Sequence, residues 1–281
     1  MKLLRTLLTL LVFAAGAFAG LHDEVLHTQV RVRTEKAGGS GTVIWAEKGA
    51  DGFYSVYALT CHHVIADALK VVEEWDPLLG KDHKVEHRRP VLVQSFKWQA
   101  VPHGKSPLTS GAEASIVAYD VKHDMALLHM RVFERPSVAE MLPLGRREEI
   151  EIGAPTVAAG CALGHTTVLT QGIITGMGDN IDYKDYILST AQIIFGNSGG
   201  GLYLKASDGY FFIGVPSRVA LAGFSDAITH MGYSSPIWRV YEFLEEQVYD
   251  FLIPGSPKTE AECASARDAK RALEEQKRRL E

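Results

Sequence analysis

The chain has 281 residues, of which 46% are hydrophobic, and it carries a formal net charge of −5. A chain of this length and apolar content can bury the core of one or two domains. No run of lysine and arginine dominates its body, so a nucleic-acid partner is not expected. The three cysteines, Cys61, Cys161 and Cys263, are too few for a disulfide framework, although one bridge between two of them stays open.

The first 19 residues have the pattern of a secretory signal peptide. Lys2 and Arg5 give a basic start, an apolar run extends from Leu7 to Ala15, and Ala17-Phe18-Ala19 supplies small residues before a cut at Gly20. The alternative is an N-terminal membrane anchor, but the run is too short to span a bilayer comfortably. We therefore expect an exported protein, periplasmic or extracellular, with no stable membrane span after signal removal.

From Val25 to about His230, short β-rich runs alternate with glycine-rich turns. This pattern is typical of an all-β sandwich or a pair of barrels. The runs are Val30–Arg33, Thr42–Trp45, Tyr54–Thr60, Val91–Val93, Ser115–Tyr119, Met125–Met130, Thr156–Gly160, Thr166–Thr170, Gly172–Thr175, Tyr186–Ser189 and Tyr210–Val215.

The stretch from Glu73 to Glu113 has four prolines and little periodicity, so we expect long connections around one or two strands. Within it, His83 and His87 are spaced as two helical metal ligands are. No third ligand lies nearby in the sequence, and two exposed loop histidines are the favoured interpretation. We therefore expect neither a metal site nor a cofactor.

Two helices are predicted at the C-terminal end. Residues 235–253 form an amphipathic helix, with Ser235 as N-cap, Pro236 at the first helical position, and an apolar stripe ending at Leu252. Residues 256–281 form a charged helical tail, where Thr259 and Glu262 make a capping box. The tail is either a coiled-coil or partner helix, through which the chain would oligomerise, or a solvated tail, which its small and sparse apolar residues favour.

The segment Gly196-Asn197-Ser198-Gly199-Gly200 places one serine between glycines. A glycine-rich turn exposes the serine hydroxyl and lets backbone amides converge on one point. An acyl-transfer nucleophile needs both features, because the amides stabilise the oxyanion that forms on attack. An ordinary loop would look the same, so the segment gains weight only from partners elsewhere in the chain.

Two such partners lie upstream. His63 follows the β-rich run that ends at Thr60, and histidine is the usual general base for a serine. Asp124 stands directly before the apolar run Met125–Met130, where a carboxylate can accept the Nδ1 proton of an imidazole and orient the ring. Each residue alone is unremarkable in a chain with 11 histidines, but the order His, Asp, Ser beside three β-rich runs is informative.

Four segments resemble the trypsin-like serine peptidases, most closely the HtrA (Deg) branch. They are the opening strand 39–44, Thr60-x-x-His63-Val64, Asp124–Leu128 and Ala191–Leu202. The resemblance covers about 30–233 and implies an all-β, chymotrypsin-like fold of two antiparallel six-stranded β-barrels, residues 20–145 and 146–234, with C-terminal helices. It also implies a serine endopeptidase that hydrolyses polypeptides through a covalent acyl-enzyme, without a cofactor.

Carried over to this sequence, the resemblance makes Ser198 the nucleophile, His63 the general base and Asp124 the orienting acid. The amides of Gly196 and Ser198 would form the oxyanion hole. His63 is preferred to its neighbour at position 62 because only His63 keeps the Thr-x-x-His-Val register. Asp124 is preferred to the aspartate at position 120 because it abuts the apolar run.

The same alignment implies the substrate site. Gln192 would lie near the bottom of the primary specificity pocket, and a peptide would add as a strand along 213–217. Because no carboxylate occurs among these residues, we expect a preference for neutral, small-to-medium apolar side chains over arginine or lysine. The substrate-binding residues would be Gln192, Ile213, Gly214, Val215, Pro216 and Ser217.

The chain departs from the family in three places. Cys61 and His62 replace the small or amide residues usual before the histidine. Phe195 stands where the HtrA branch often has proline. No segment after Tyr233 resembles that branch's peptide-binding module, so substrate capture through such a module is not implied.

Two other functions remain open on the sequence. The same barrels could serve as a catalytically idle scaffold or binding protein, although the presence of all three triad residue types disfavours this. A serine esterase of another fold would also place a serine within Gly-x-Ser-x-Gly. That fold needs the order Ser, Asp, His and helical crossovers, neither of which this sequence offers. Cys61 likewise has two interpretations, a nucleophile or metal ligand and, more simply, a small buried apolar residue.

Overall fold

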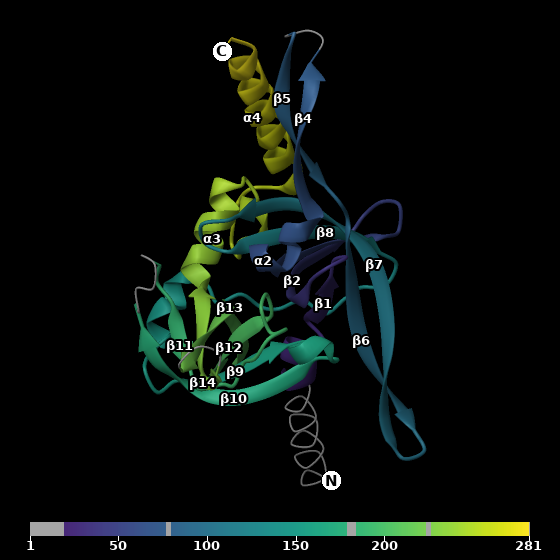
Figure 1. Cartoon of the computed structure of the whole chain (residues 1–281). Coiled ribbons are helices and arrows are strands. Elements are labelled where there is room, and N and C mark those ends of the chain that lie inside the picture. Colours follow the sequence, from purple (N-terminus) through teal and green to yellow (C-terminus); the bar gives the residue numbers. More distant parts are fainter. Residues whose placement is uncertain (1–19, 77–79, 179–183, 223–225, 281) are drawn as a thin grey trace, which may run out of the picture.

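The computed structural model describes residues 20–76, 80–178, 184–222 and 226–280. The expected signal peptide, residues 1–19, lies outside them. The described strands form two closed barrels and one projecting two-stranded sheet, and helices follow them at the C-terminal end (Figure 1).

The first barrel has the strand order β1-β2-β3-β8-β7-β6, with every neighbouring pair antiparallel. Its strands are β1 (Gln29–Arg33), β2 (Gly38–Lys48), β3 (Tyr54–Thr60), β6 (Val91–Val101), β7 (Gly104–Asp120) and β8 (Met125–Val132). Strands β3 and β8 carry the strongest apolar runs. Their register sets Leu59 opposite Leu127, and both side chains are fully buried.

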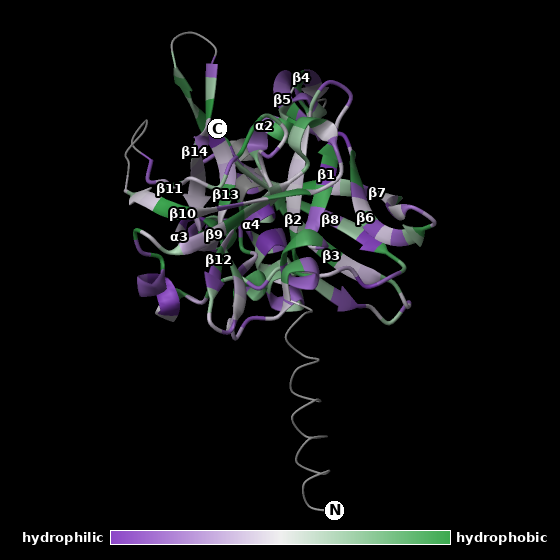
Figure 2. Ribbon diagram, turned by 90° about the horizontal axis from the view of Figure 1, so that it is seen from below, coloured by the Kyte–Doolittle hydropathy of each residue, from purple (hydrophilic) through white to green (hydrophobic). Residues whose placement is uncertain are grey.

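The second barrel has the order β10-β11-β14-β13-β12-β9 and is also antiparallel throughout. Its strands are β9 (Pro155–Gly160), β10 (Val168–Met177), β11 (Ile187–Ser189), β12 (Gly201–Ala206), β13 (Gly209–Ala222) and β14 (Asp226–Pro236). Hydrophobic and hydrophilic residues alternate along many of the barrel strands, as expected for strands with one face on a core (Figure 2). The prediction of two six-stranded antiparallel barrels with C-terminal helices is confirmed.

A buried polar cluster joins the two barrels. The Tyr203 hydroxyl, on β12, lies 2.7 Å from the Thr28 hydroxyl and accepts a hydrogen bond of 2.7 Å from Gln29 Nε2. Gln29 also bonds to Thr42 on β2. Burying these groups without partners would be costly, so the cluster favours one relative placement of the first strands and β12.

The expectation of long connections between Glu73 and Glu113 is wrong. This stretch runs through four strands: β4 (Leu69–Asp76) and β5 (Lys81–Arg88) form the projecting sheet, and β6 and β7 form a long hairpin of the first barrel. The prolines misled the prediction because they fall where a missing N–H is tolerated. Pro102 lies at the tip of the β6–β7 hairpin, and Pro107 lies in the part of β7 that pairs with β6 alone.

The histidines of this stretch therefore lie on a strand. His87, on β5, pairs with Glu74 on β4 at 2.7 Å, and His83 faces the same side of the sheet. His83 and His87 are thus four residues apart along one strand, and they do not have the spacing of two ligands on one turn of a helix.

The amphipathic helix is shorter than predicted. The helix α3 spans Ile237–Glu246, since Ser235 and Pro236 remain paired with β13 as the end of β14. The helix ends with bonds from the Tyr249 amide to the Leu244 carbonyl and from the Val248 amide to the Glu245 carbonyl. This is a Schellman arrangement, in which Val248 takes the left-handed position that glycine usually occupies, with φ +60°. The end of the predicted stripe falls instead in the short 3₁₀ turn η5 (Asp250–Leu252).

The tail contains the helix α4 (Glu260–Leu280), which leaves the body beside the first barrel (Figure 1). The predicted capping box is confirmed, since the Thr259 amide bonds to Glu262 at 2.8 Å and the Glu262 amide bonds back to Thr259 at 3.3 Å. The first turns of α4 are docked rather than solvated, because Cys263 is buried and Glu260 accepts a bond from the Tyr57 hydroxyl at 2.7 Å. All three cysteines are buried and free, so the bridge left open by the sequence does not form.

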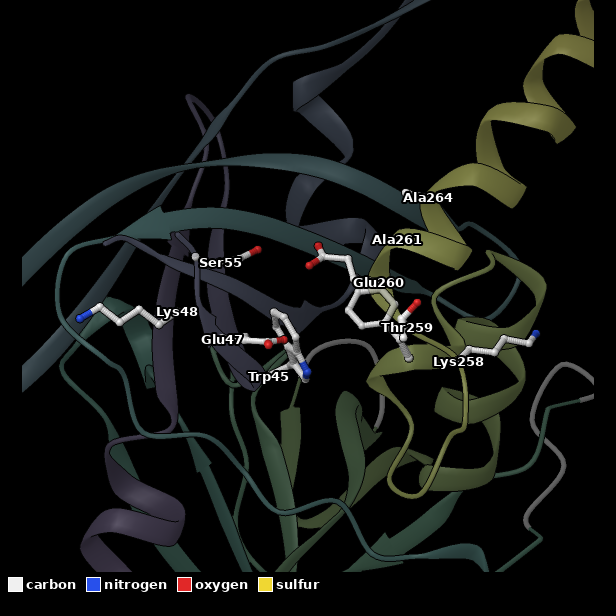
Figure 3. A pocket seen from close by; sticks show the side chains of 11 residues that line it. Trp45, Glu47, Lys48, Ser55, Lys258, Thr259, Glu260, Ala261 and Ala264 are labelled. Carbon is white, nitrogen blue, oxygen red and sulfur yellow. The ribbon is translucent and has the colours of Figure 1, made fainter. Parts of the chain in front are cut away.

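A hollow remains between α4 and the first barrel. Glu260 and Ser55 face it from opposite sides, and Trp45 and Lys258 also line it (Figure 3). None of the residues expected at the catalytic site lines this hollow. In the described part of the chain, no helix has the length and apolar character needed to cross a membrane.

The left-handed backbone of Val248 gives a stability prediction. Glycine tolerates this conformation, whereas an L side chain is disfavoured there. We expect Val248→Gly to be more stable than Val248→Ala by about 1 kcal/mol. Both variants lose the valine side chain, so their difference isolates the backbone effect.

The matched pair is Val101→Gly and Val101→Ala, at a strand residue of ordinary φ, where the glycine variant should be the less stable one. Denaturant titration of the four proteins measures the free energies of unfolding. The same order at both positions would contradict the assignment of strain to Val248.

Candidate active site

His63 lies just beyond the end of β3, in the single helical turn α2 (His62–Ile65). Its backbone amide donates to Asp124 Oδ1 at 2.9 Å, and its Nδ1 lies 2.7 Å from Asp124 Oδ2. The ring is about half exposed, whereas the Asp124 side chain is mostly covered, at 49% and 18%. Two bonds to one carboxylate fix both the position and the orientation of the imidazole, and the Nε2 atom makes no bond among the described residues.

Asp124 stands at the tight turn between β7 and β8. The carboxylate of Asp120 accepts the amides of Lys122 at 2.7 Å and His123 at 3.2 Å, and it lies 2.5 Å from His123 Nδ1. Burial opposes its ionisation, but the hydrogen bonds from His123 and the turn amides hold the pKa of Asp120 below its ordinary value. The turn ends with Asp124 in the left-handed region at φ +56°.

The two aspartates of this turn thus have different partners. Asp120 bonds within the turn, and Asp124 bonds to His63. The neighbouring His62 ring lies 5.4 Å from the Tyr119 ring and makes no bond with either aspartate in the described residues. The register argument therefore selected the histidine and the aspartate that the fold brings together.

The serine loop has two glycines with left-handed backbones, Gly196 at φ +96° and Gly199 at φ +85°. A Cβ at Gly196 would lie 2.6 Å from the Leu163 nitrogen, and one at Gly199 would lie 2.3 Å from the Ser40 carbonyl oxygen. Both positions therefore require glycine for backbone conformation and for space. Between them, Asn197 Oδ1 accepts the Ile194 amide at 3.1 Å and closes the loop.

Ser40 connects the serine loop to the first barrel. Its amide donates to the Ser198 carbonyl at 2.8 Å, and its hydroxyl donates to the Gly196 carbonyl at 2.6 Å. The same hydroxyl accepts the Cys161 amide at 2.6 Å. Sequence reasoning assigned no role to this side chain. Its place between two glycines in an opening strand was the available signal, but nothing in the sequence tells which loop it would reach.

The serine loop also lies against the segment that carries His63. A Cβ added to Gly199 would approach Thr60 Oγ1 to 2.4 Å and the Cys61 nitrogen to 2.9 Å, so the backbones are in close contact. The Ser198 side chain is partly exposed. Within the described residues, its hydroxyl makes no hydrogen bond with His63, and the amides of Gly196 and Ser198 donate to no protein acceptor.

Cys61 lies fully buried directly behind this site. Its thiol contacts the Pro216 carbonyl at 3.4 Å, so the simpler sequence interpretation of a buried residue fits its exposure. Burial, with a smaller contribution from the Asp124 charge, raises the pKa of this thiol well above its ordinary value. A thiol held protonated in this way is a poor nucleophile.

Five of the expected substrate residues, 213–217, lie on β13, and Gln192 lies in the connection between β11 and β12. Gln192 is exposed, while Val215 and Pro216 are buried. Strand β13 pairs with β14 along one edge, and with β12 along the other only as far as Gly214. Gly214 is thus paired on both sides, Ile213 lies at an irregularity in the pairing with β12, and the edge beyond Gly214 has no β12 partner. The Ser217 hydroxyl is buried and has no hydrogen-bond partner among the described residues.

Comparison with known proteins identifies the family of the chain. A family model described as "Trypsin-like peptidase domain" matches residues 39–215, more than half of the chain. A protein of Chlamydia trachomatis named "Probable periplasmic serine endoprotease DegP-like" is 28% identical over 183 residues, covering 58% of this chain and 30% of its own. One of Haemophilus influenzae named "Probable periplasmic serine protease do/HhoA-like" is 28% identical over 215 residues, covering 73% of this chain and 37% of its own.

The chain thus spans about a third of the length of these relatives. The crystal structure of a serine endoprotease from Yersinia pestis aligns with a TM-score of 0.55 at 21% identity. That alignment covers 82% of this chain and 66% of the other, and it shows a shared fold. With the matching family model and the two barrels, the chain belongs to the family of trypsin-like peptidase domains.

Proposed function

We propose that the protein is a serine endopeptidase in which Ser198, His63 and Asp124 form the catalytic triad. The observation that carries the proposal is the doubly bonded His63–Asp124 pair, carried by a segment that the serine loop touches at Gly199. Among the described residues, the amides of Gly196 and Ser198 have no acceptor. Catalytic hydrogen bonds to a serine often close only when substrate binds, so the open Ser198 hydroxyl is compatible with the role.

The chemistry follows from these positions. His63 Nε2 removes the proton of the Ser198 hydroxyl as the oxygen attacks the scissile carbonyl. The Asp124 carboxylate stabilises the imidazolium that forms and keeps the ring in place. The amides of Gly196 and Ser198 receive the oxyanion, and His63 then protonates the leaving amine. Water then takes the place of the amine. His63 removes a proton from it as its oxygen attacks the acyl carbonyl, and the same proton passes to the Ser198 oxygen as the ester bond breaks.

The substrate is a polypeptide that adds to the open edge of β13. The edge beyond Gly214 offers backbone groups for strand pairing, and the Pro216 carbonyl next to it accepts the Gly199 amide at 2.9 Å, which ties this edge to the serine loop. Ile213 and Gly214 support this edge from inside the sheet. Gln192, Val215, Pro216 and Ser217 carry no charge, which supports a neutral apolar specificity.

Export and assembly complete the proposal. The basic and apolar start of the sequence and the periplasmic names of two relatives support an exported enzyme. The helix α4 is a candidate contact for oligomerisation beyond its docked first turns. A catalytically idle scaffold is disfavoured, because all three triad residue types are present and His63 and Asp124 are bonded to each other.

Labelling with a fluorophosphonate tests the nucleophile. We expect the wild-type protein to label on one serine, and Ser198→Ala to lose the label, because in this proposal Ser198 is the nucleophile activated by His63. Ser55→Ala is the matched control, since Ser55 also lies beside a histidine, His129, at 2.9 Å but has no glycine-rich loop. Labelling that persists in Ser198→Ala, or that disappears in Ser55→Ala, would refute the assignment.

The pH profile tests the base. An imidazolium cannot accept the serine proton, so kcat/KM should fall as the pH is lowered from about 8 to about 5. Asp124→Asn should lower kcat by about 10⁴-fold, because the amide cannot hold the productive tautomer of His63. Peptide hydrolysis across this range gives both quantities, and a flat profile together with an active Asp124→Asn variant would exclude the pair from catalysis.

Ser40 is a positioning residue in this account. Ser40→Ala leaves the Gly196 carbonyl and the Cys161 amide without their partner, so the oxyanion loop should shift and kcat should fall by about 10²-fold. Both Ser40→Ala and Ser55→Ala should lose about 1–3 kcal/mol of stability, but only the first should lose kcat. Equal kcat in the two variants would reduce Ser40 to a structural role.

A further inference from the structure

Cys61 carries a buried thiol that the proposed mechanism does not use. It lies between β3 and α2, two residues before His63. Its sulfur, a His63 ring nitrogen and an Asp124 carboxylate oxygen all lie within 4.8 Å of one another. Among the described residues, this is the one group of three such ligand atoms that lie close enough to share an ion.

The three donors suit a zinc-like ion. Thiolate, imidazole and carboxylate are the ligands of Zn²⁺ in proteins, at distances of about 2.0–2.3 Å. Ligand atoms around a tetrahedral ion are then separated by about 3.5 Å. His63 Nδ1 and Asp124 Oδ2 are already 2.7 Å apart, so the ion must separate these two and draw Cys61 closer by a small side-chain movement.

The surroundings allow an ion to enter from one side. The His63 ring is half exposed and the Asp124 carboxylate is partly exposed, whereas Cys61 is at the closed end. Pro216, which contacts the thiol, is followed by Ser217, whose buried hydroxyl has no partner among the described residues. The buried end of the site thus holds the Cys61 sulfur, and water from the exposed side of His63 can supply a fourth ligand.

We propose that Cys61, His63 and Asp124 bind Zn²⁺ or a similar soft divalent ion, and that the bound ion switches off the peptidase. The switching rests on the proposed function of Ser198 and His63, whereas the binding does not. The Cys61 thiol releases its proton to solvent and forms a sulfur–metal bond. The Nδ1 proton of His63 moves to Nε2 as Nδ1 binds the ion, so the ring presents a donor to Ser198 and cannot accept its proton.

Cobalt spectroscopy tests the binding without any use of activity. Co²⁺ added to Ser198→Ala should produce a thiolate-to-cobalt absorption band that saturates at one ion per chain and disappears when Zn²⁺ is added. The band should remain in Ser198→Ala/Cys263→Ala, which lacks another buried thiol, and should be lost in Ser198→Ala/Cys61→Ala. Cys61→Ser, closer in volume, should lose it as well. A band that never forms, or that survives both Cys61 changes, overturns the site.

Inhibition tests the switch. ZnCl₂ should inhibit peptide hydrolysis by the wild-type protein and by Cys263→Ala, and EDTA should restore it. In Cys61→Ala the half-inhibiting concentration, measured against that variant's own uninhibited rate, should rise at least about tenfold, because loss of even an outer partner weakens metal sites by this much.

The outcomes separate the two proposals. A Cys61-dependent cobalt band with undiminished hydrolysis in Zn²⁺ overturns the switch. If Ser198→Ala still hydrolyses peptides, the proposed catalytic role fails, while the cobalt titration still decides the metal site.

Discussion

The carboxylate of Asp124 is the constraint on which the site depends. Its two oxygens take the backbone amide and the Nδ1 of the same residue, His63. A single hydrogen bond would fix a distance, but two fix the orientation of the ring as well. Because charge-assisted bonds of this kind are stronger than neutral ones, the pair can hold an imidazole that is half exposed to solvent.

The turn between β7 and β8 positions this carboxylate. Strands β7 and β8 belong to the buried sheet of the first barrel, and Asp120 gathers the amides of the turn between them. Asp124 emerges from that turn with a left-handed backbone and meets the residue that follows β3, the strand paired with β8. The same β3 end contacts Gly199, so the strand pairing of one barrel also determines where the serine loop of the other can lie.

Much of this could be predicted because it depends on local sequence pattern. The strands β3 and β8 are strongly apolar, the glycines around Ser198 form a short local pattern that gains weight from His63 and Asp124, and the Thr259–Glu262 capping box is a short-range motif. The choice of His63 and Asp124 over their neighbours depended on motif register, and the structure pairs the two chosen residues.

Other features depend on contacts that the sequence does not display. The four strands between Leu69 and Asp120 were not predicted, because this stretch contains prolines. Hairpin tips and unpaired strand edges tolerate the missing N–H of proline. The end of α3 depends on Val248 accepting a conformation that its side chain disfavours. Ser40 and Cys61 lie within recognised motifs of the first barrel. Their partners Gly196 and Pro216 belong to the second barrel, and only the folded chain brings them together.

The central claim is that three side chains and two amides meet at one reacting carbonyl. A crystal structure of the protein inactivated by a peptidyl phosphonate tests it most directly. The account predicts phosphorus bonded to Ser198 Oγ, one phosphonate oxygen between the amides of Gly196 and Ser198, and His63 still bonded to Asp124. Phosphorus on another residue, or the oxygen turned away from those amides, would contradict it.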